Sequence, residues 1–328
     1  MKTPLQSKKL RSENNWSQEQ LVRKLARVIL LGSVLPVFYL VNIFGVAEGA
    51  DFCQKTSQTA LSSCQAGAQS DKLLAIGKCD NLSDAAARAE CKTQASADRK
   101  DARQTCQDQF DARQAVCDRL GPAPYDPVID PANFVAIIDN PFFSLTPGTT
   151  FIYESATEHD EFFVTHNTKM ILGVTCIEVH DTSTVGGQLT EDTFDWFAQD
   201  KDGNVWYFGE NSRQLVGGVI VGVEGSWTAG VDGAKPGIIM EAHPAVGDFY
   251  RQEFALGTAE DVGKVLSLSE SVTVPAGSFN NCLKTKDTSP LEPDVVENKF
   301  YCPGKGDVLE IDLTSGERLE LKGITTGG

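Results

Sequence analysis

The sequence predicts an α+β protein in separate parts, a disulfide-stapled antiparallel helical hairpin followed by an antiparallel β-meander that forms a half-barrel or a sandwich. Six of the nine Cys lie in residues 53–117, a segment without Pro that is rich in Ala, Gln, Asp, Arg and Lys. A Pro-rich stretch over 121–131 ends this helical pattern and is expected to be a stiff linker. After it, short β-branched and aromatic runs recur between Gly, Asp and Asn, which is typical of antiparallel strands.

Residues 1–49 are expected to be a signal peptide or a signal anchor. A basic, polar stretch is followed by an apolar run over 28–46, and small residues make cleavage after Ala47 or Gly49 possible. An uncleaved anchor stays open, because an apolar run of about 19 residues is near the minimum for a membrane span. Both alternatives predict an extracytoplasmic protein, periplasmic or secreted, that an uncleaved segment could anchor.

The charge is unevenly distributed. The net charge is −16; residues 1–49 hold seven Lys and Arg against three Glu, so they are +4 and the remainder is −20. An acidic surface argues against nucleic acid as a partner, because neutralising phosphates needs Lys and Arg. It equally argues against docking of the folded part on anionic lipid.

The helical hairpin is expected over residues 51–120. One helix covers 52–76 and another begins after Ser83, read as its N-cap, with the turn at 77–81. No His and no CxxC motif lies here, so the cysteines indicate disulfides rather than a metal site, and no cofactor is expected. The hairpin would be a stalk, a spacer or an arm that binds a protein partner.

Pairing follows from folding the helices back on each other. Cysteines eleven residues apart share a helix face but lie roughly 16 Å apart, too far to bond to each other. Antiparallel packing about the expected turn then predicts the disulfides Cys64–Cys91 and Cys53–Cys106. Cys79 and Cys117 are left as an uncertain third pair.

The β domain is expected over residues 132–328, with about ten strands and an irregular Gly-rich insertion at 217–237. The candidate strands are 149–154, 162–171, 175–181, 193–199, 205–209, 248–254, 259–274, 282–288, 296–301, 308–313 and 318–321. Three cysteines lie in this part of the chain. Cys282 is expected to pair either with Cys302, across a hairpin, or with Cys176.

The stretch 195–210 is the strongest local signal. Asp200-Lys-Asp-Gly203 fits a type I turn, which makes Asp200 and Asn204 the closing pair of a β-hairpin. Counting outward pairs Ala198 with Trp206, Trp196 with Phe208 and Phe194 with Glu210. The aromatic residues Phe194, Trp196, Trp206 and Phe208 should share one face, with Asp195, Gln199 and Tyr207 on the other.

The shared aromatic face suggests the first hypothesis about function. Those four side chains either pack against a core or line a cavity for an apolar small molecule, a lipid or a partner. The turn is also similar to a calcium-binding loop through Asp200, Asp202 and Asn204, but it lacks the full EF-hand spacing.

Several segments carry a resemblance to known proteins. The runs Asn140–Tyr153, Asp195–Glu210, Lys235–Ile239, Val246–Arg251 and Cys282–Lys286 resemble a family of uncharacterised exported bacterial β-rich proteins, over about residues 125–322. The run Phe300-Tyr-Cys-Pro-Gly304 is loosely similar to lipoprotein-carrier half-barrels. The family resemblance implies export and a β fold, and it implies no activity.

Catalytic motifs are missing from the sequence. There is no GxSxG, HExxH, P-loop or dinucleotide-binding fingerprint. The alternative to a binding protein is a hydrolase or a metal-dependent enzyme that uses His180, Asp192 and Asp195, if these side chains converge on one concave face. A non-enzymatic exported binding protein is the favoured interpretation.

Overall fold

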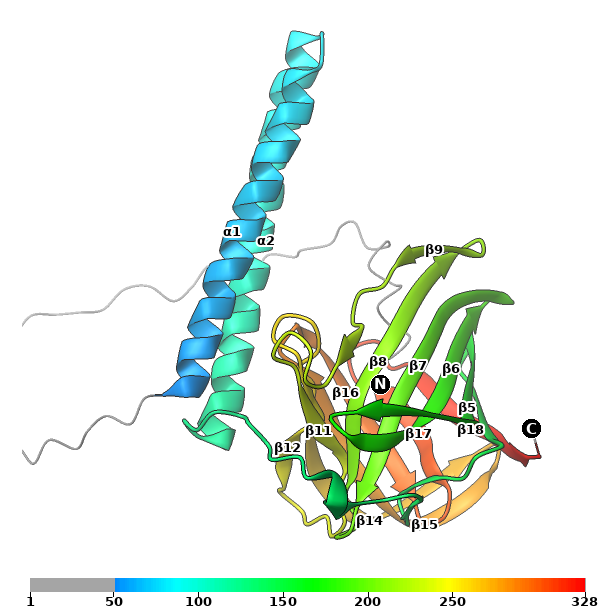
Figure 1. Cartoon of the computed structure of the whole chain (residues 1–328). Helices are drawn as coiled ribbons and strands as arrows, with labels where there is room; N and C mark the ends of the chain where they lie inside the picture. The colour runs from blue at the N-terminus through cyan, green and yellow to red at the C-terminus, as the bar shows by residue number, and fades with distance from the viewer. Residues whose placement is uncertain (1–50, 328) are drawn as a thin grey trace, which may run out of the picture. The chain divides into compact units, whose positions relative to one another are not determined.

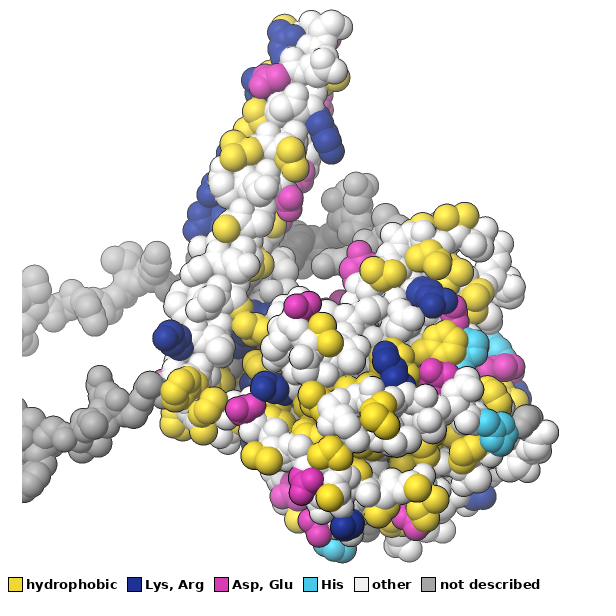
Figure 2. Space-filling view, in the orientation of Figure 1, with side chains coloured by type: hydrophobic (Ala, Val, Ile, Leu, Met, Phe, Trp, Pro, Cys, Tyr) yellow, Lys and Arg dark blue, Asp and Glu magenta, His cyan; other side chains and the backbone are white. Residues whose placement is uncertain are grey.

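The computed structural model describes residues 51–327, and the predicted signal peptide or anchor lies outside this range. The described residues belong to one compact unit. It begins with two long helices, α1 (Phe52–Asp80) and α2 (Ala85–Leu120), which run side by side in Figure 1. Lys, Arg, Asp and Glu side chains are spread along this hairpin in Figure 2.

Both helices begin at a capping aspartate. The Asp51 carboxylate accepts a hydrogen bond from the Gln54 backbone N–H, and that of Asp84 accepts one from Ala87. The predicted cap at Ser83 is therefore wrong by one residue. The predicted turn at 77–81 is wrong too, since α1 continues through Gly77 to Asp80.

Three disulfides join the helices, and their pairs are Cys53–Cys117, Cys64–Cys106 and Cys79–Cys91. The residue numbers of each pair add to 170, which is the signature of one antiparallel register. The cysteines follow one another at intervals of 11 and 15 residues, close to whole numbers of helical turns, so they form a single row between the helices.

The disulfide framework was thus predicted correctly, but its pairings were wrong. Neither Cys64–Cys91 nor Cys53–Cys106 forms, and Cys79 and Cys117 do not bond to each other. Partners in a hairpin mirror each other about the turn. If the centre of the turn lies some number of residues further along the chain, the partner of each α1 cysteine therefore lies twice that number further along α2.

The rest of the chain is β-structure, entered through a 3₁₀ turn at Pro131–Asn133. The strands are β1 (Phe134–Val135), β2 (Ile138–Asn140), β3 (Phe143–Leu145), β4 (Thr149–Glu154), β5 (Glu158–Ile171), β6 (Val174–Val185), β7 (Gln188–Asp200), β8 (Val205–Val216) and β9 (Val219–Gly222). They continue with β10 (Trp227–Thr228), β11 (Lys235–Met240), β12 (Phe249–Arg251), β13 (Glu253–Phe254), β14 (Val262–Val274), β15 (Gly277–Ser289), β16 (Glu292–Cys302), β17 (Gly306–Asp312) and β18 (Arg318–Thr326). The stretch 217–237, expected to be irregular, contains β9, β10 and the start of β11.

Sixteen of the strands form one large antiparallel sheet that is nearly barrel-shaped, and β2 and β3 pair with each other as a separate hairpin. The order of the large sheet is β12-β14-β15-β16-β17-β18-β4-β5-β6-β7-β8-β11-β13, with β1, β9 and β10 attached beside this path. The two ends of that order, β12 and β13, are separated in the chain by Gln252 alone, which brings the edges together. This architecture agrees with the predicted fold class.

The interior of the sheet contains a continuous group of aromatic rings. Phe197 of β7 stacks on Tyr207 of β8 at 4.8 Å between ring centroids, and it also contacts Phe162 of β5 at 6.4 Å. Phe143 of β3 contacts both Phe197 and Tyr301 of β16. Since β7 and β16 are far apart in the sheet, rings that connect them must lie inside it, and the β2–β3 hairpin covers this part of the interior.

The end of the helical hairpin that holds the start of α1 and the end of α2 is fixed to the sheet by a buried ion pair. Arg113 of α2 donates Nε and one Nη to the two carboxylate oxygens of Glu260, at 2.8 and 2.7 Å. Gln109 of α2 donates to the Leu291 carbonyl nearby. Arg113 and Glu260, which are 147 residues apart in the sequence, thus hold the helical hairpin against the sheet.

A fourth disulfide joins Cys282 to Cys302, one of the two alternatives that the sequence left open, and Cys176 is a free, buried thiol. Four disulfides are compatible with an extracytoplasmic location. Within residues 51–327, no helix is both long and apolar enough to cross a membrane.

Candidate functional site

The residues of the enzyme hypothesis do not converge. His180 Nε2 lies 2.6 Å from the Asp192 carboxylate, which also accepts a hydrogen bond from Arg213, and the His180 ring stacks on Phe194. Asp195 points to the other side of β7, where its carboxylate accepts a hydrogen bond from the Tyr207 hydroxyl. Successive side chains of a strand point to opposite faces of the sheet. Because positions 192 and 195 of β7 differ by an odd number of residues, the two carboxylates lie on opposite faces.

The 200–204 turn forms as predicted. The Asp200 N–H donates to the Asn204 carbonyl, and the Asp200 carboxylate accepts from the Asn204 N–H, the Asn204 amide and the Trp206 indole. The carboxylate is therefore used by the turn itself, and Asp202 is exposed. Among the described residues, no group of three or more His, Cys, Asp and Glu is placed to hold a metal ion.

A β-bulge changes the register of this hairpin. Ala198 pairs with Trp206 as predicted, but Trp196 pairs with Gly209 and Phe194 with Asn211, because Phe208 is an extra residue on β8. The predicted pairs Trp196–Phe208 and Phe194–Glu210 are therefore wrong. Gly209 has a φ of +137° and lies against the backbone of Trp227, a conformation and a closeness that no other residue tolerates.

The four predicted aromatic residues fall into three separate environments. Trp206 and Phe208 both pack edge-on against Phe134, so this pair is covered by protein. Phe194 lies beneath His180. Trp196 is the member that lines a pocket.

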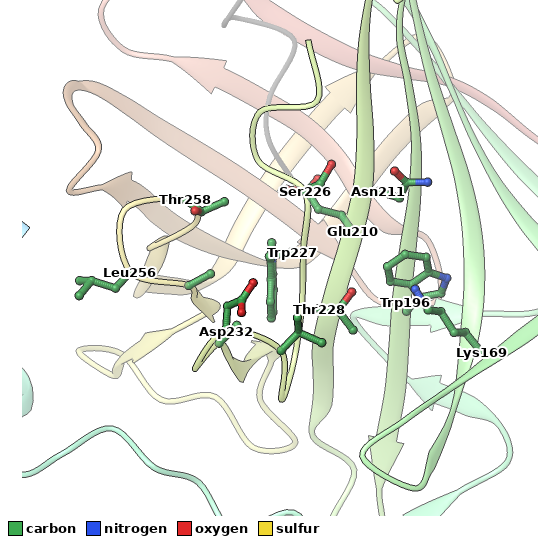
Figure 3. A pocket seen from close by; sticks show the side chains of 13 residues that line it. Lys169, Trp196, Glu210, Asn211, Ser226, Trp227, Thr228, Asp232, Leu256 and Thr258 are labelled. Carbon is green, nitrogen blue, oxygen red and sulfur yellow. The ribbon is translucent and has the colours of Figure 1, made fainter. Parts of the chain in front are cut away.

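This pocket, called here the Trp196 pocket, has a volume of about 470 Å³. It lies at β8 and β10, where Trp227 stands between Trp196 and Lys169 on one side and Asp232, Leu256 and Thr258 on the other (Figure 3). The full lining is Lys169, Trp196, Glu210, Asn211, Ser226, Trp227, Thr228, Val231, Asp232, Ala234, Ala255, Leu256 and Thr258.

Hydrogen bonds fix both indoles of the pocket. Trp196 Nε1 donates to Glu178 at 3.2 Å, and Trp227 Nε1 donates to the buried Glu253 at 2.8 Å. The Lys169 ammonium lies 3.1 Å from the centroid of the Trp196 ring, and burial lowers its pKa. Because both indole N–H groups already donate hydrogen bonds to protein carboxylates, only the carbon atoms of the rings are offered to a ligand. Lys169 supplies a cation beside the Trp196 ring.

Buried carboxyl groups form a second feature, which the sequence reasoning missed. Asp181 of β6 is the strand-register partner of Phe162 of β5, whose ring belongs to the aromatic interior. The Asp181 side chain is hydrogen-bonded to that of Asp160. Burial raises the pKa of Asp160 to about 7, as it does that of Glu158, and raises the pKa of Asp181 well above its usual value. Two carboxyl groups this close share a proton rather than ionise together.

The available signal was the alternation of acidic residues along β5. Positions 158 and 160 are both acidic, and each second residue of a strand faces the same side. Apolar neighbours such as Phe162 then indicate that this side is the interior. Glu310, whose negative charge helps to raise the Asp160 pKa, is itself paired with Lys299, whose ammonium lies 3.2 Å away.

Comparison with known proteins adds little to this description. No family model and no curated protein matches the chain. A solved structure of a putative lipoprotein from Parabacteroides distasonis ATCC 8503 is 14% identical with a TM-score of 0.27, and the match covers 56% of this chain and 98% of that one. A similarity this low carries neither fold nor family over, so membership in a family of exported β-rich proteins stays a prediction.

Proposed function

We propose that this is an exported, non-enzymatic binding protein, periplasmic or secreted, whose β domain takes a small ligand in the Trp196 pocket. The disulfide-stapled hairpin serves as its stalk. The observation that carries the proposal is a pocket of about 470 Å³, within the usual size range of ligand sites, that places two indoles beside Lys169.

The lining points to an amphipathic ligand rather than a plain hydrocarbon. Trp196 and Trp227 offer apolar surface, and Leu256 adds an aliphatic side chain at the opposite wall. Glu210 and Asp232 are carboxylates among these groups, which would penalise a ligand without polar atoms. A molecule with an aromatic or aliphatic body and a few hydrogen-bonding groups satisfies both requirements.

A neutral aromatic amine, N-phenyl-1-naphthylamine, is a suitable probe because its fluorescence rises in an apolar site. The protein should bind it saturably with one probe per chain. Leu256 is 43% exposed, so Leu256→Glu should weaken binding about tenfold by placing a charge in the pocket without disturbing the core.

Leu313 provides the matched control. It is 52% exposed and does not line the Trp196 pocket, so Leu313→Glu makes the same chemical change elsewhere. The proposal fails if the probe does not saturate, or if the two variants weaken binding equally.

A further inference from the structure

A second pocket lies where the helical hairpin meets the sheet, and the proposed function does not use it. This junction pocket has a volume of about 260 Å³. Its walls come from the start of α1, the chain just after α2, and β12–β13. Its lining includes Phe52, Thr56, Leu120, Tyr125, Arg251 and Phe254.

Arg251 is the charged residue among these walls. It is only 7% exposed, and its guanidinium lies over the rings of Phe254 at 4.4 Å and Tyr125 at 5.5 Å. Both Nε and Nη1 are buried without a hydrogen-bond partner. A buried cation normally has its N–H groups satisfied, so this arrangement leaves interaction capacity unused.

Glu260, the acidic group that attracts Arg251, cannot satisfy it. Both carboxylate oxygens of Glu260 are bound by Arg113, and one also accepts the Gly257 N–H at 2.7 Å. Tyr125 does not supply an anion either, because its hydroxyl donates to the Pro236 carbonyl and burial raises its pKa to about 12. Two guanidinium groups thus share one carboxylate, which leaves an excess positive charge beside the pocket.

The remaining lining limits what kind of anion fits. Thr56 is the other side chain with a hydroxyl in the pocket, and it donates to the helix carbonyls of Phe52 and Cys53. A phosphate needs several donors around it, which these walls do not offer. A single carboxylate needs one guanidinium, and an apolar body suits walls such as Leu120 and Phe254.

We propose that the junction pocket binds a small apolar carboxylate, with its carboxylate against Arg251 and its hydrocarbon body along Phe52, Leu120 and Phe254. A ligand there would contact the helical hairpin and the sheet together. It would therefore stabilise their association as well as satisfy the guanidinium.

Octanoate tests the inference, with 1-octanol as the neutral probe of equal chain length. Titration calorimetry of the whole exported chain, residues 50–328, should show octanoate binding at one site, and 1-octanol at least tenfold more weakly. Arg251→Gln, which keeps a similar size and removes the charge, should abolish the preference for octanoate. Equal binding of the two probes, or an unchanged preference in the variant, would overturn the proposal.

A second pair of variants keeps the test valid if Arg251→Gln does not fold. Phe52 is 46% exposed at the first turn of α1, where Glu and Gln are both tolerated. Phe52→Glu should weaken octanoate binding at least fivefold more than Phe52→Gln, because it places a like charge at the pocket. If the two Phe52 variants bind octanoate alike, no carboxylate lies in the junction pocket.

The variant Leu256→Glu separates this inference from the Trp196 pocket, because it should leave octanoate binding unchanged. A loss of octanoate binding in that variant would place the carboxylate in the Trp196 pocket and overturn the assignment.

Discussion

The ion pair Arg113–Glu260 offers a sharp test of how the helical hairpin is held. Both side chains are nearly inaccessible, at 6% and 1% exposure, and the contact is bidentate. Removing one partner of a buried pair costs about 3–5 kcal/mol, because the other is left as an uncompensated charge. The variants Arg113→Leu and Glu260→Leu should nevertheless lose different amounts of unfolding free energy, because Glu260 also attracts Arg251.

Arg113→Leu leaves Glu260 with the Gly257 N–H and the attraction of Arg251, so we expect a loss near 3 kcal/mol, the low end of the range. Glu260→Leu leaves two buried guanidinium groups without a counter-charge, and the loss should be near 5 kcal/mol. The double variant removes both members, so its loss should fall short of the sum of the single losses by about 2–3 kcal/mol.

Urea denaturation with intact disulfides measures these values. Tryptophan fluorescence follows the β domain, which contains Trp196, Trp206 and Trp227, and circular dichroism at 222 nm follows the helices. The exposed pair Lys92–Asp80 is the control, since Lys92→Met should cost at most about 1 kcal/mol. A coupling below about 0.5 kcal/mol, or a greater loss for Arg113→Leu than for Glu260→Leu, would refute the reasoning.

Two further predictions concern the sheet. Burial raises the folded-state pKa values of Asp160 and Asp181 above their unfolded values, so the folded pair holds a shared proton that the unfolded chain releases. Stability should therefore fall as pH rises from about 4 to 7, by about 1.4 kcal/mol per pH unit for that shared proton. Melting temperatures should be higher at pH 5 than at pH 8, and Asp160→Asn should flatten this profile; a higher melting temperature at pH 8 would contradict it. Gly209→Ala should cost at least about 2 kcal/mol in thermal unfolding, because its Cβ would collide with the Trp227 backbone. Gly186→Ala, in the left-handed region with open space around it, should cost about 1 kcal/mol, and equal losses would show that the collision is relieved.

Local features of the chain were the most predictable. The 200–204 turn depends on hydrogen bonds between residues at most four apart, so Asp200 and Asn204 identify it without knowledge of the rest of the chain. The pairing of Ala198 with Trp206 follows directly from that turn. Further out the prediction failed at the bulge, since Gly209 is required there by Trp227, a residue on another strand.

The disulfides show how a small local error grows. Composition and the even number of cysteines correctly indicated two helices joined by cysteine pairs, and these depend only on residues within the segment. The partner of each cysteine depends on where the turn lies, and the predicted turn begins at Gly77, whereas the helix continues through Gly77 to Asp80. A Cβ at position 77 would meet no neighbouring atom, so Gly77 is not required there by packing and costs the helix only its low propensity, which the three disulfides offset.

The sequence by itself determined the two-part architecture, the disulfide framework and the hairpin turn, because helical composition, strand alternation and turn chemistry act over a few residues. Only the tertiary structure decided which side chains meet across the sheet. It separated Asp195 from His180, brought Arg113 to Glu260, and left Arg251 with an unsatisfied guanidinium in a pocket. These contacts join segments far apart in the chain, and whether a charge is paired depends on every neighbour that the fold places around it.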